Sequence, residues 1–387
     1  MLNKDDLIQG AVDKTGLQAF GGPEFQPALA RLIDALNSEA RLNDFGQFRA
    51  KMSIEAGLTD NLQIQDYILR HPEVCDEAVV RPVFIVGLPR TGTTALHHML
   101  NQDLDNHTLR LWEAQNPVPP PRTETYTSDP RIERQQSGVD LTEQFLPGFL
   151  KTHLIDAQEP DECYMLLNRC FMSVEYSAMY HIPSYANWLY QQLPHSNVYA
   201  YHRQQLQLLQ SHRPGQWILK APFHQLGLEG ILQQYPDAVI VQTHRAPLSI
   251  VGSGCSFSEI LRNSGSDHSD RKQVGRDWME MLTVYTQTFE AARARLEPGR
   301  GHQFIDVYHD EFVNDPWPVI DAIYRACDRQ LSEPGRAAMQ TWLANNPKGK
   351  HGKHEYELAD YGISEADVER LFGDYVTLYN LTPGDQQ

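Results

Sequence analysis

The chain has 387 residues, which is long enough to bury a large core in one big domain or two. Its formal net charge of −17 argues against general nucleic-acid binding, because phosphate backbones need a basic surface. The five cysteines are dispersed, without a CxxC pair or a metal-ligand spacing, which indicates reduced thiols. We therefore expect a cytoplasmic protein, and no apolar run reaches transmembrane length or forms a signal peptide.

Residues 1 to about 80 are predicted to form a helical N-terminal arm. Apolar residues recur at helical spacing from Phe25 to Leu36, and Leu7 with Val12 indicates an earlier helix. The segment 21–23, Gly-Gly-Pro, separates the two helices. No residue type here has a catalytic spacing. The arm is expected to pack on the core or on a partner subunit, as in a homodimer.

The stretch 82–101 is predicted to form a strand, a tight turn and a helix. Val83–Val86 is a short apolar run typical of a strand buried on both faces. Thr93 and Thr94 are start signals for a helix in which apolar residues follow at helical spacing. The turn at 87–92 aims backbone N–H groups and a positive helix end at one point, which suits a phosphate or sulfate. Arg90 adds a fixed charge with a planar fork of donors.

The same turn resembles a Walker A loop, with Gly87 and Gly92 in register. However, Thr93 stands where that motif has its lysine, and a P-loop NTPase also needs an acid at a neighbouring strand end to hold magnesium. The other strand candidates end in Lys220 and Arg245. Bases at strand ends favour an anionic nucleotide that is bound without a metal.

Two features follow the first helix. Glu113 is either a functional acid or a solvated loop acid, and Pro117–Arg122 is predicted to be extended. The segment from about 123 to 215 is predicted to be mixed helical, is rich in tyrosine, and interrupts the alternation of strands and helices. Such an insertion suits a lid and an acceptor pocket, although its tyrosines would serve equally well in a core.

The alternation then resumes, and it predicts an α/β fold with a parallel sheet flanked by helices. Strands are expected at 217–219, 238–241 and 303–308, with helices from about 248 and around 278–289. The ligand site of such a sheet lies at the carboxyl ends of its strands. Four polar residues are placed at such ends, namely Arg90, Lys220, Arg245 and Tyr308.

A second anion-binding candidate lies near the C-terminus. The tract 334–354 contains no acid in an otherwise acidic chain. It contains these basic residues: Arg336, Lys348, Lys350, His351, Lys353 and His354.

Together these motifs resemble the sulfotransferase family, which uses 3′-phosphoadenosine 5′-phosphosulfate (PAPS), and in particular its bacterial members with a helical N-terminal arm. The resemblance implies that six consecutive residues bind the 5′-phosphosulfate: Pro89, Arg90, Thr91, Gly92, Thr93 and Thr94. It implies that Arg245 and Ser253, eight residues apart, hold the 3′-phosphate, with Tyr308 near the adenine. It further implies that a glycine-containing basic tract closes over the same phosphate, which here is Lys348, Lys350, His351, Gly352 and Lys353.

The catalytic base departs from the pattern of the cytosolic family members, because Pro222 occupies the position of their histidine. Other branches use a glutamate roughly twenty residues beyond the first loop, and Glu113 matches it. The alternatives are His224, His153, Glu159 and Glu162. Arg90 and Lys220 would stabilise the leaving oxygen.

The resemblance thus implies transfer of a sulfuryl group from PAPS to a hydroxyl of a small-molecule or lipid-like acceptor, without a metal. A nucleotide or small-molecule kinase and a non-catalytic nucleotide-binding protein remain as alternatives. The expected domains are an arm at 1–80 and an α/β domain at 81–387, with the insertion or lid at about 114–216.

Overall fold

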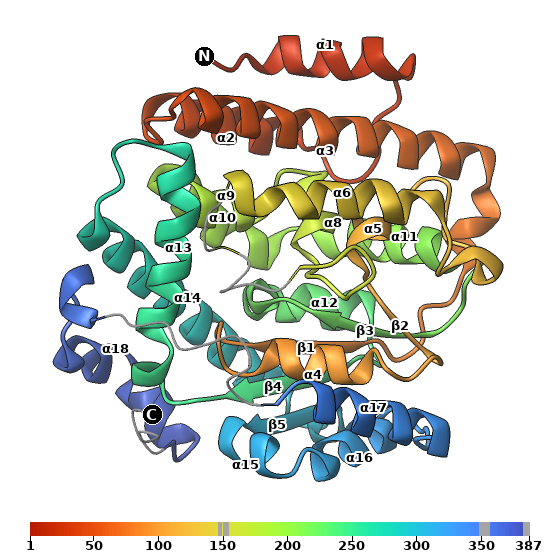
Figure 1. Ribbon diagram of the computed structural model, residues 1–387, viewed down its shortest axis with the longest axis vertical. Coiled ribbons are helices and arrows are strands. Elements are labelled where there is room, and N and C mark those ends of the chain that lie inside the picture. Colours follow the sequence, from red (N-terminus) through yellow and green to blue (C-terminus); the bar gives the residue numbers. More distant parts are fainter. Residues whose placement is uncertain (146–148, 150–154, 348–356, 382–387) are drawn as a thin grey trace. The chain divides into compact units, whose positions relative to one another are not determined.

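A computed structural model describes residues 1–145, 149, 155–347 and 357–381 (Figure 1). The chain divides into two compact units, each made of separate stretches of sequence. The first unit comprises Met1–Val79, Leu109–Gly215 and Ile260–Ser269. The second comprises Val80–Thr108, Gln216–Glu259 and Asp270–Gln387.

The second unit contains a parallel sheet of five strands in the order β2-β3-β1-β4-β5. The strands are β1 (Val83–Gly87), β2 (Asn106–Thr108), β3 (Gln216–Lys220), β4 (Val239–His244) and β5 (Phe304–Tyr308). Since every pair is parallel, the carboxyl ends lie at one edge, and the register pairs Gly87 with Thr243 and His244 with Tyr308. The predicted α/β fold class is confirmed. The sequence did not predict β2, which is a short edge strand.

Helices cover both faces of this sheet. They are α4 (Thr93–Leu100), α12 (Leu228–Gln234), α14 (Arg271–Leu296), α15 (His309–Asn314), α16 (Trp317–Ala326), α17 (Glu333–Asn345) and α18 (Glu365–Leu378). Alternation along β1 explains the two faces. Ile85 belongs to a core cluster with residues of α4, α16 and α17, whereas the neighbouring Phe84 packs on Tyr235 and His224. All five residues of β1 are buried, as expected for a central parallel strand.

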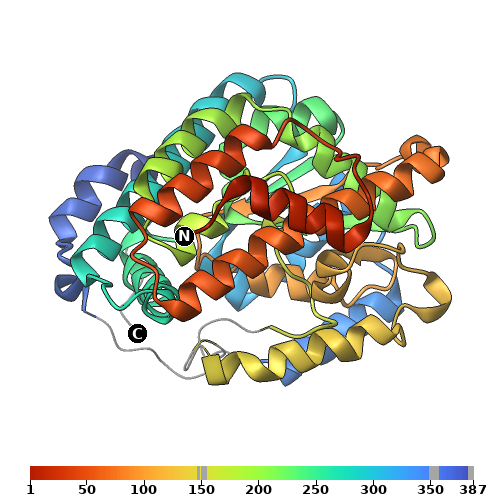
Figure 2. The same cartoon turned by 90° about the horizontal axis from the view of Figure 1, so that it is seen from above.

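The regular elements described in the first unit are helices. They are α1 (Lys4–Thr15), α2 (Gln26–Ser38), α3 (Asp44–Arg70), α5 (Leu111–Gln115), α6 (Pro130–Phe145), α8 (Tyr164–Asn168), α9 (Glu175–Met179), α10 (Pro183–Gln192) and α11 (Val198–Gln210). Helix α13 (Val251–Gly265) spans the boundary between the two units. The side chains of Asn3 and Asn43 cap the N–H groups that begin α1 and α3. Figure 2 shows α1 beside α3, against which it packs.

A buried arginine joins the N-terminal helices to the later segment of the first unit. Arg169 is fully buried, and its guanidinium donates to the carboxylate of Asp60 on α3, to Oε1 of Gln205 and to the carbonyl oxygen of Ala114. The amide of Asn61, also on α3, donates to the carbonyl oxygens of Arg169 and Gly21. A buried charge needs such partners, so the contact is a fixed structural link.

Most tyrosines of the segment 123–215 lie in the core. The buried ones are Tyr126, Tyr176, Tyr180, Tyr185, Tyr199 and Tyr201, and burial raises the pKa of each. Packing therefore accounts for these residues. No helix among the described residues combines the length and the apolar character needed to cross a membrane.

Candidate functional site

The loop after β1 is held tightly against β4 in the second unit. Gly87 has φ +137°, and a Cβ atom there would lie 2.3 Å from Oγ1 of Thr243, so only glycine permits this approach. Thr91 Oγ1 donates to the carbonyl oxygen of Leu88 at 2.6 Å and lies 2.5 Å from Oγ1 of Thr243. The loop closes through these two hydroxyl groups. Thr243 was not among the predicted site residues.

The loop then leads into α4 at Gly92, whose φ of +96° also favours glycine. Thr93 is the first residue of α4 and is buried, whereas Thr94 is exposed. The first turn of a helix has N–H groups without intrahelical partners, and the helix dipole is positive at this end. The predicted residues from Pro89 to Thr94 therefore form one loop and helix start that suits an anion.

Two arginines from separate motifs meet at this loop. Nε of Arg90 donates to Oγ of Ser253 at 3.1 Å, and Nη1 of Arg245 donates to the carbonyl oxygen of Arg90 at 3.2 Å. Arg90 has φ +73°, a left-handed conformation that is uncommon for a residue with a side chain. Among the residues that the structure describes, no carboxylate forms an ion pair with Arg245. Arg90 and Arg245 therefore bring two guanidinium groups, from two separate motifs, to one loop.

His309, which the sequence analysis did not identify, lies beside the same loop. A Cβ atom on Gly92 would be 3.4 Å from Cδ2 of His309, and the Nδ1 atom of His309 is 3.0 Å from Oδ1 of Asp310. The signal that could have found His309 is its position, directly after Tyr308 at the end of β5.

Lys220 and Tyr308 end their strands at the same edge of the sheet as the loop. Lys220 is buried, and the register places Ile85 of β1 beside it, two residues before Gly87. Burial, and after it the charge of Lys220, hold the pKa of His97 well below its usual range. Tyr308 is partly buried, which raises its pKa, and its ring centroid lies 5.4 Å from that of His244.

The candidate base Glu113 lies in the first unit, as the third residue of α5. Its side chain is fully buried, so it is not a solvated loop acid. Oε1 accepts a hydrogen bond from the backbone N–H of Arg110 at 3.0 Å and one from Oη of Tyr126 at 2.9 Å. The guanidinium carbons of Arg110 and Arg213 lie 4.4 and 3.8 Å from the ring centroid of Tyr126. The carboxylate thus has a fixed orientation in a positively charged setting.

Three of the four other candidate bases lie within the described residues. His224 is buried in the second unit, with its ring edge-on to Phe84 at 5.0 Å. Glu159 and Glu162 are partly buried in the first unit, where the carbonyl oxygen of Glu159 accepts from the N–H of Leu111. His153 lies outside the described residues, and so do Lys348, Lys350, His351, Gly352 and Lys353.

Comparison with known proteins identifies the class of protein that this fold and loop define. The model of the sulfotransferase family matches residues 82–333, which are more than half of the chain. The chain belongs to the sulfotransferase family. A search of curated proteins finds no significant match.

Two solved structures are similar over almost the whole chain. The sulfotransferase STF1 from Mycobacterium tuberculosis H37Rv is 34% identical with a TM-score of 0.85, over 96% of this chain and 99% of that one. The sulfotransferase STF9 from Mycobacterium avium is 30% identical with a TM-score of 0.89, over 99% of this chain and 98% of that one. The resemblance inferred from the motifs is therefore confirmed.

Proposed function

We propose that this protein transfers a sulfuryl group from PAPS to a hydroxyl of a small-molecule or lipid-like acceptor. One observation carries the proposal. Arg245 donates to the backbone of Arg90, and Arg90 donates to Ser253, so the two anion-binding motifs meet at one loop. A nucleotide with anionic groups at both its 3′ and 5′ positions matches two adjacent guanidinium groups, which are the preferred partners of phosphate oxygens.

In this proposal the donor lies along the carboxyl edge of the sheet. The loop N–H groups, the start of α4 and Arg90 bind the 5′-phosphosulfate, while Arg245 binds the 3′-phosphate. The family resemblance adds Ser253 at the 3′-phosphate and Tyr308 at the adenine. It also assigns the tract around Lys348, Lys350, His351, Gly352 and Lys353 to closing over the 3′-phosphate.

The chemical step is an in-line displacement at sulfur. The acceptor oxygen forms a bond to sulfur while the bond from sulfur to the bridging phosphate oxygen breaks, which releases adenosine 3′,5′-bisphosphate. Glu113 takes the acceptor proton as general base, a role typically worth about 10²–10⁴-fold. The hydrogen bonds from Arg110 and Tyr126 fix one carboxylate oxygen and thereby the direction of the other. Arg90 and Lys220 stabilise the charge that develops on the leaving oxygen.

The experiment combines equilibrium binding with transfer assays. Calorimetry compares adenosine 3′,5′-bisphosphate with adenosine 5′-phosphate, and we expect the bisphosphate to bind at least about tenfold tighter because of one charge-assisted contact. Labelled PAPS is then incubated with a panel of alcohols and phenols, with and without a magnesium chelator. We expect a labelled acceptor whose formation the chelator does not reduce.

Two results would overturn the proposal. Magnesium-dependent phosphate transfer from ATP would identify a kinase. Tight binding of the bisphosphate, with no transfer to any acceptor of a broad panel, would identify a non-catalytic nucleotide-binding protein.

A further inference from the structure

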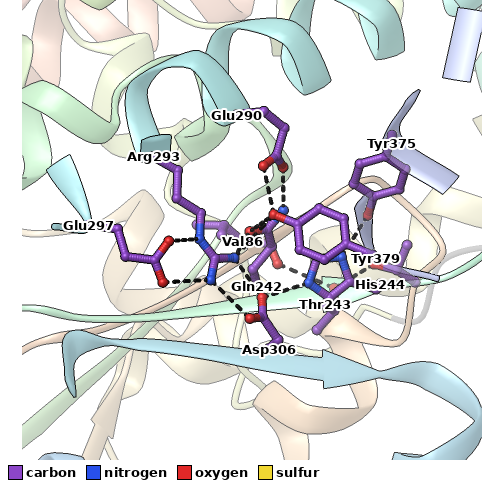
Figure 3. A network of polar contacts seen from close by, with 11 residues as sticks. Val86, Gln242, Thr243, His244, Glu290, Arg293, Glu297, Asp306, Tyr375 and Tyr379 are labelled. Carbon is purple, nitrogen blue, oxygen red and sulfur yellow. Dashed lines mark hydrogen bonds and ion pairs between the residues drawn. The ribbon is translucent and has the colours of Figure 1, made fainter. Parts of the chain in front are cut away.

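Strand β4 carries polar side chains on both of its faces, and each face contacts a different part of the second unit. Side chains alternate along a strand, so Gln242 and His244 share one face while Thr243 occupies the other. Thr243 contacts the loop through Thr91 and the carbonyl oxygen of Val86. Gln242 and His244 face residues of α14 and α18 (Figure 3).

His244 is held at both ring nitrogens. Its Nε2 lies 2.8 Å from Oδ1 of Asp306 on β5, and its Nδ1 lies 2.9 Å from Oη of Tyr375 on α18. Asp306 also accepts two hydrogen bonds from Arg293, at 2.6 and 2.9 Å. Burial acts to raise the pKa of Asp306, but the hydrogen bonds from Arg293 and His244 outweigh it and hold that pKa well below the usual range. Asp306 is therefore a fixed carboxylate acceptor for the imidazole.

A second tyrosine hydroxyl enters the same network at a different place. Tyr379, at the end of α18, donates from Oη to Oε2 of Glu290 at 2.6 Å. Gln242 donates to the other oxygen of Glu290 at 2.8 Å and accepts from Nη1 of Arg293 at 2.5 Å. Tyr375 thus lies in the last turn of α18 and Tyr379 directly follows that helix, yet only the hydroxyl of Tyr375 bonds to His244.

We propose that the chain of contacts Tyr375–His244–Asp306 positions Arg245 for recognition of the 3′-phosphate; this inference rests on the function proposed above. Arg245 directly follows His244, the last residue of β4, so its backbone direction depends on how that residue is held. A bidentate contact between a guanidinium and a phosphate requires the correct angle as well as charge. His244, Asp306 and Tyr375 are positioning residues, since they act through Arg245.

The test uses the two tyrosines as a matched pair. Tyr375→Phe and Tyr379→Phe each remove one hydroxyl from the network, but only the first removes a contact to His244. Calorimetry gives the affinity ratio of adenosine 3′,5′-bisphosphate over adenosine 5′-phosphate for each variant. We expect Tyr375→Phe to lower this ratio about 3- to 10-fold, the range for one lost hydrogen bond, and Tyr379→Phe to keep it within about twofold. For Tyr375→Phe we also expect a higher KM for PAPS with an unchanged kcat.

A second variant tests the other ring nitrogen. Asp306→Ala removes the acceptor of Nε2, whereas Asp306→Asn retains a carbonyl oxygen there, so we expect the ratio to fall in the alanine variant and to recover partly in the asparagine variant. Wild-type ratios in Tyr375→Phe and Asp306→Ala, or equal losses in the two tyrosine variants, would overturn the positioning role alone. A wild-type protein without preference for the bisphosphate would overturn the proposed function, and the positioning role with it.

Discussion

Nε of Arg90 donates to the hydroxyl oxygen of Ser253 at 3.1 Å, although 163 positions separate the two residues in the sequence. The family resemblance assigns Arg90 to the 5′ end of the donor and Ser253 to its 3′-phosphate. Their contact means that the two proposed subsites share a hydrogen bond before any ligand is considered. Variants of Ser253 and Arg245 should therefore differ in a characteristic way.

Ser253→Ala should weaken the binding of both nucleotides, with and without a 3′-phosphate. The variant removes the acceptor that orients Arg90, and a typical hydrogen bond contributes about 0.5–1.5 kcal/mol, so we expect about a 2- to 10-fold rise in each Kd. Calorimetry with adenosine 3′,5′-bisphosphate and adenosine 5′-phosphate measures both values. An effect confined to the bisphosphate would show that Ser253 serves the 3′-phosphate alone.

Arg245→Ala should weaken the binding of adenosine 3′,5′-bisphosphate far more than the binding of adenosine 5′-phosphate. Loss of a charge-assisted contact to the 3′-phosphate costs about 1.5–3 kcal/mol, which is roughly a 10- to 150-fold rise in Kd. The same calorimetric pair reports the difference. Arg276→Ala is the matched control, because it removes an exposed arginine of α14 from the same unit. Equal weakening of both nucleotides would place the 3′-phosphate elsewhere.

Glu113→Gln should leave donor binding unchanged and lower kcat at least about a hundredfold. The amide keeps the size of the side chain and an oxygen that accepts from Arg110 and Tyr126, so a slower rate reports the lost proton acceptor. Steady-state rates with saturating PAPS measure kcat, and calorimetry with the bisphosphate measures donor binding.

The comparison variant for the base is His224→Asn. An active His224 variant beside an inactive Glu113 variant supports the assignment, whereas the reverse result transfers the role to His224. Full activity in both variants would direct attention to His153, Glu159 and Glu162.

Gly92→Ala should impair donor binding through backbone strain. Its φ of +96° lies in the left-handed region, where a side chain costs roughly 1–2 kcal/mol, and the added methyl group would lie 3.4 Å from His309. We expect a lower melting temperature and a several-fold lower affinity for adenosine 3′,5′-bisphosphate. Gly373→Ala is the control, since a Cβ atom there meets nothing within 4 Å and the residue lies within α18. That variant should be about 0.5–1 kcal/mol more stable, and a similar gain for Gly92→Ala would contradict the strain argument.

Glu175→Gln should stabilise the first unit in a pH-dependent way. Burial raises the pKa of Glu175 to about 7, against an opposing hydrogen bond from the amide of Asn168. A folded-state pKa above the unfolded value means that the folded state holds the extra proton, so wild-type stability falls as pH rises from about 4.5 to about 7. We expect a gain of about 1–3 kcal/mol above pH 7 and almost none near pH 4.5, where the carboxyl group is protonated in the folded state. Urea unfolding at pH 4.5 and pH 8 measures both values, and equal gains would contradict the assignment.

Local sequence patterns were sufficient to predict the central strands and the first loop. Val83–Val86 is apolar on both faces, and the glycines that flank the turn have the positive φ angles that such a turn requires. Local patterns were not sufficient to predict β2, because its three residues, Asn106–Thr108, are too few and too polar for a periodic signal. A strand of this length is defined by its hydrogen bonds to β3.

The contacts of the site residues depended on partners far away in the sequence. Glu113, for example, accepts a hydrogen bond from the hydroxyl group of Tyr126, which follows a proline-rich stretch of the chain. The alternation of Gln242, Thr243 and His244 could have shown that two of them share a face, but not that α14 and α18 supply their partners. Tertiary packing creates such contacts, and a single sequence does not encode them as a local pattern.

The link between Arg169 and Asp60 limits how this protein can be shortened. The family model begins at residue 82, so a fragment cut there would retain Arg169 but lose the carboxylate on α3 that balances its charge. Leaving one partner of a buried ion pair alone typically costs about 3–5 kcal/mol, which is a large share of the stability of a domain. A fragment limited to residues 82–333 is therefore expected to be less stable than the whole chain, and protein engineering should keep the first 79 residues.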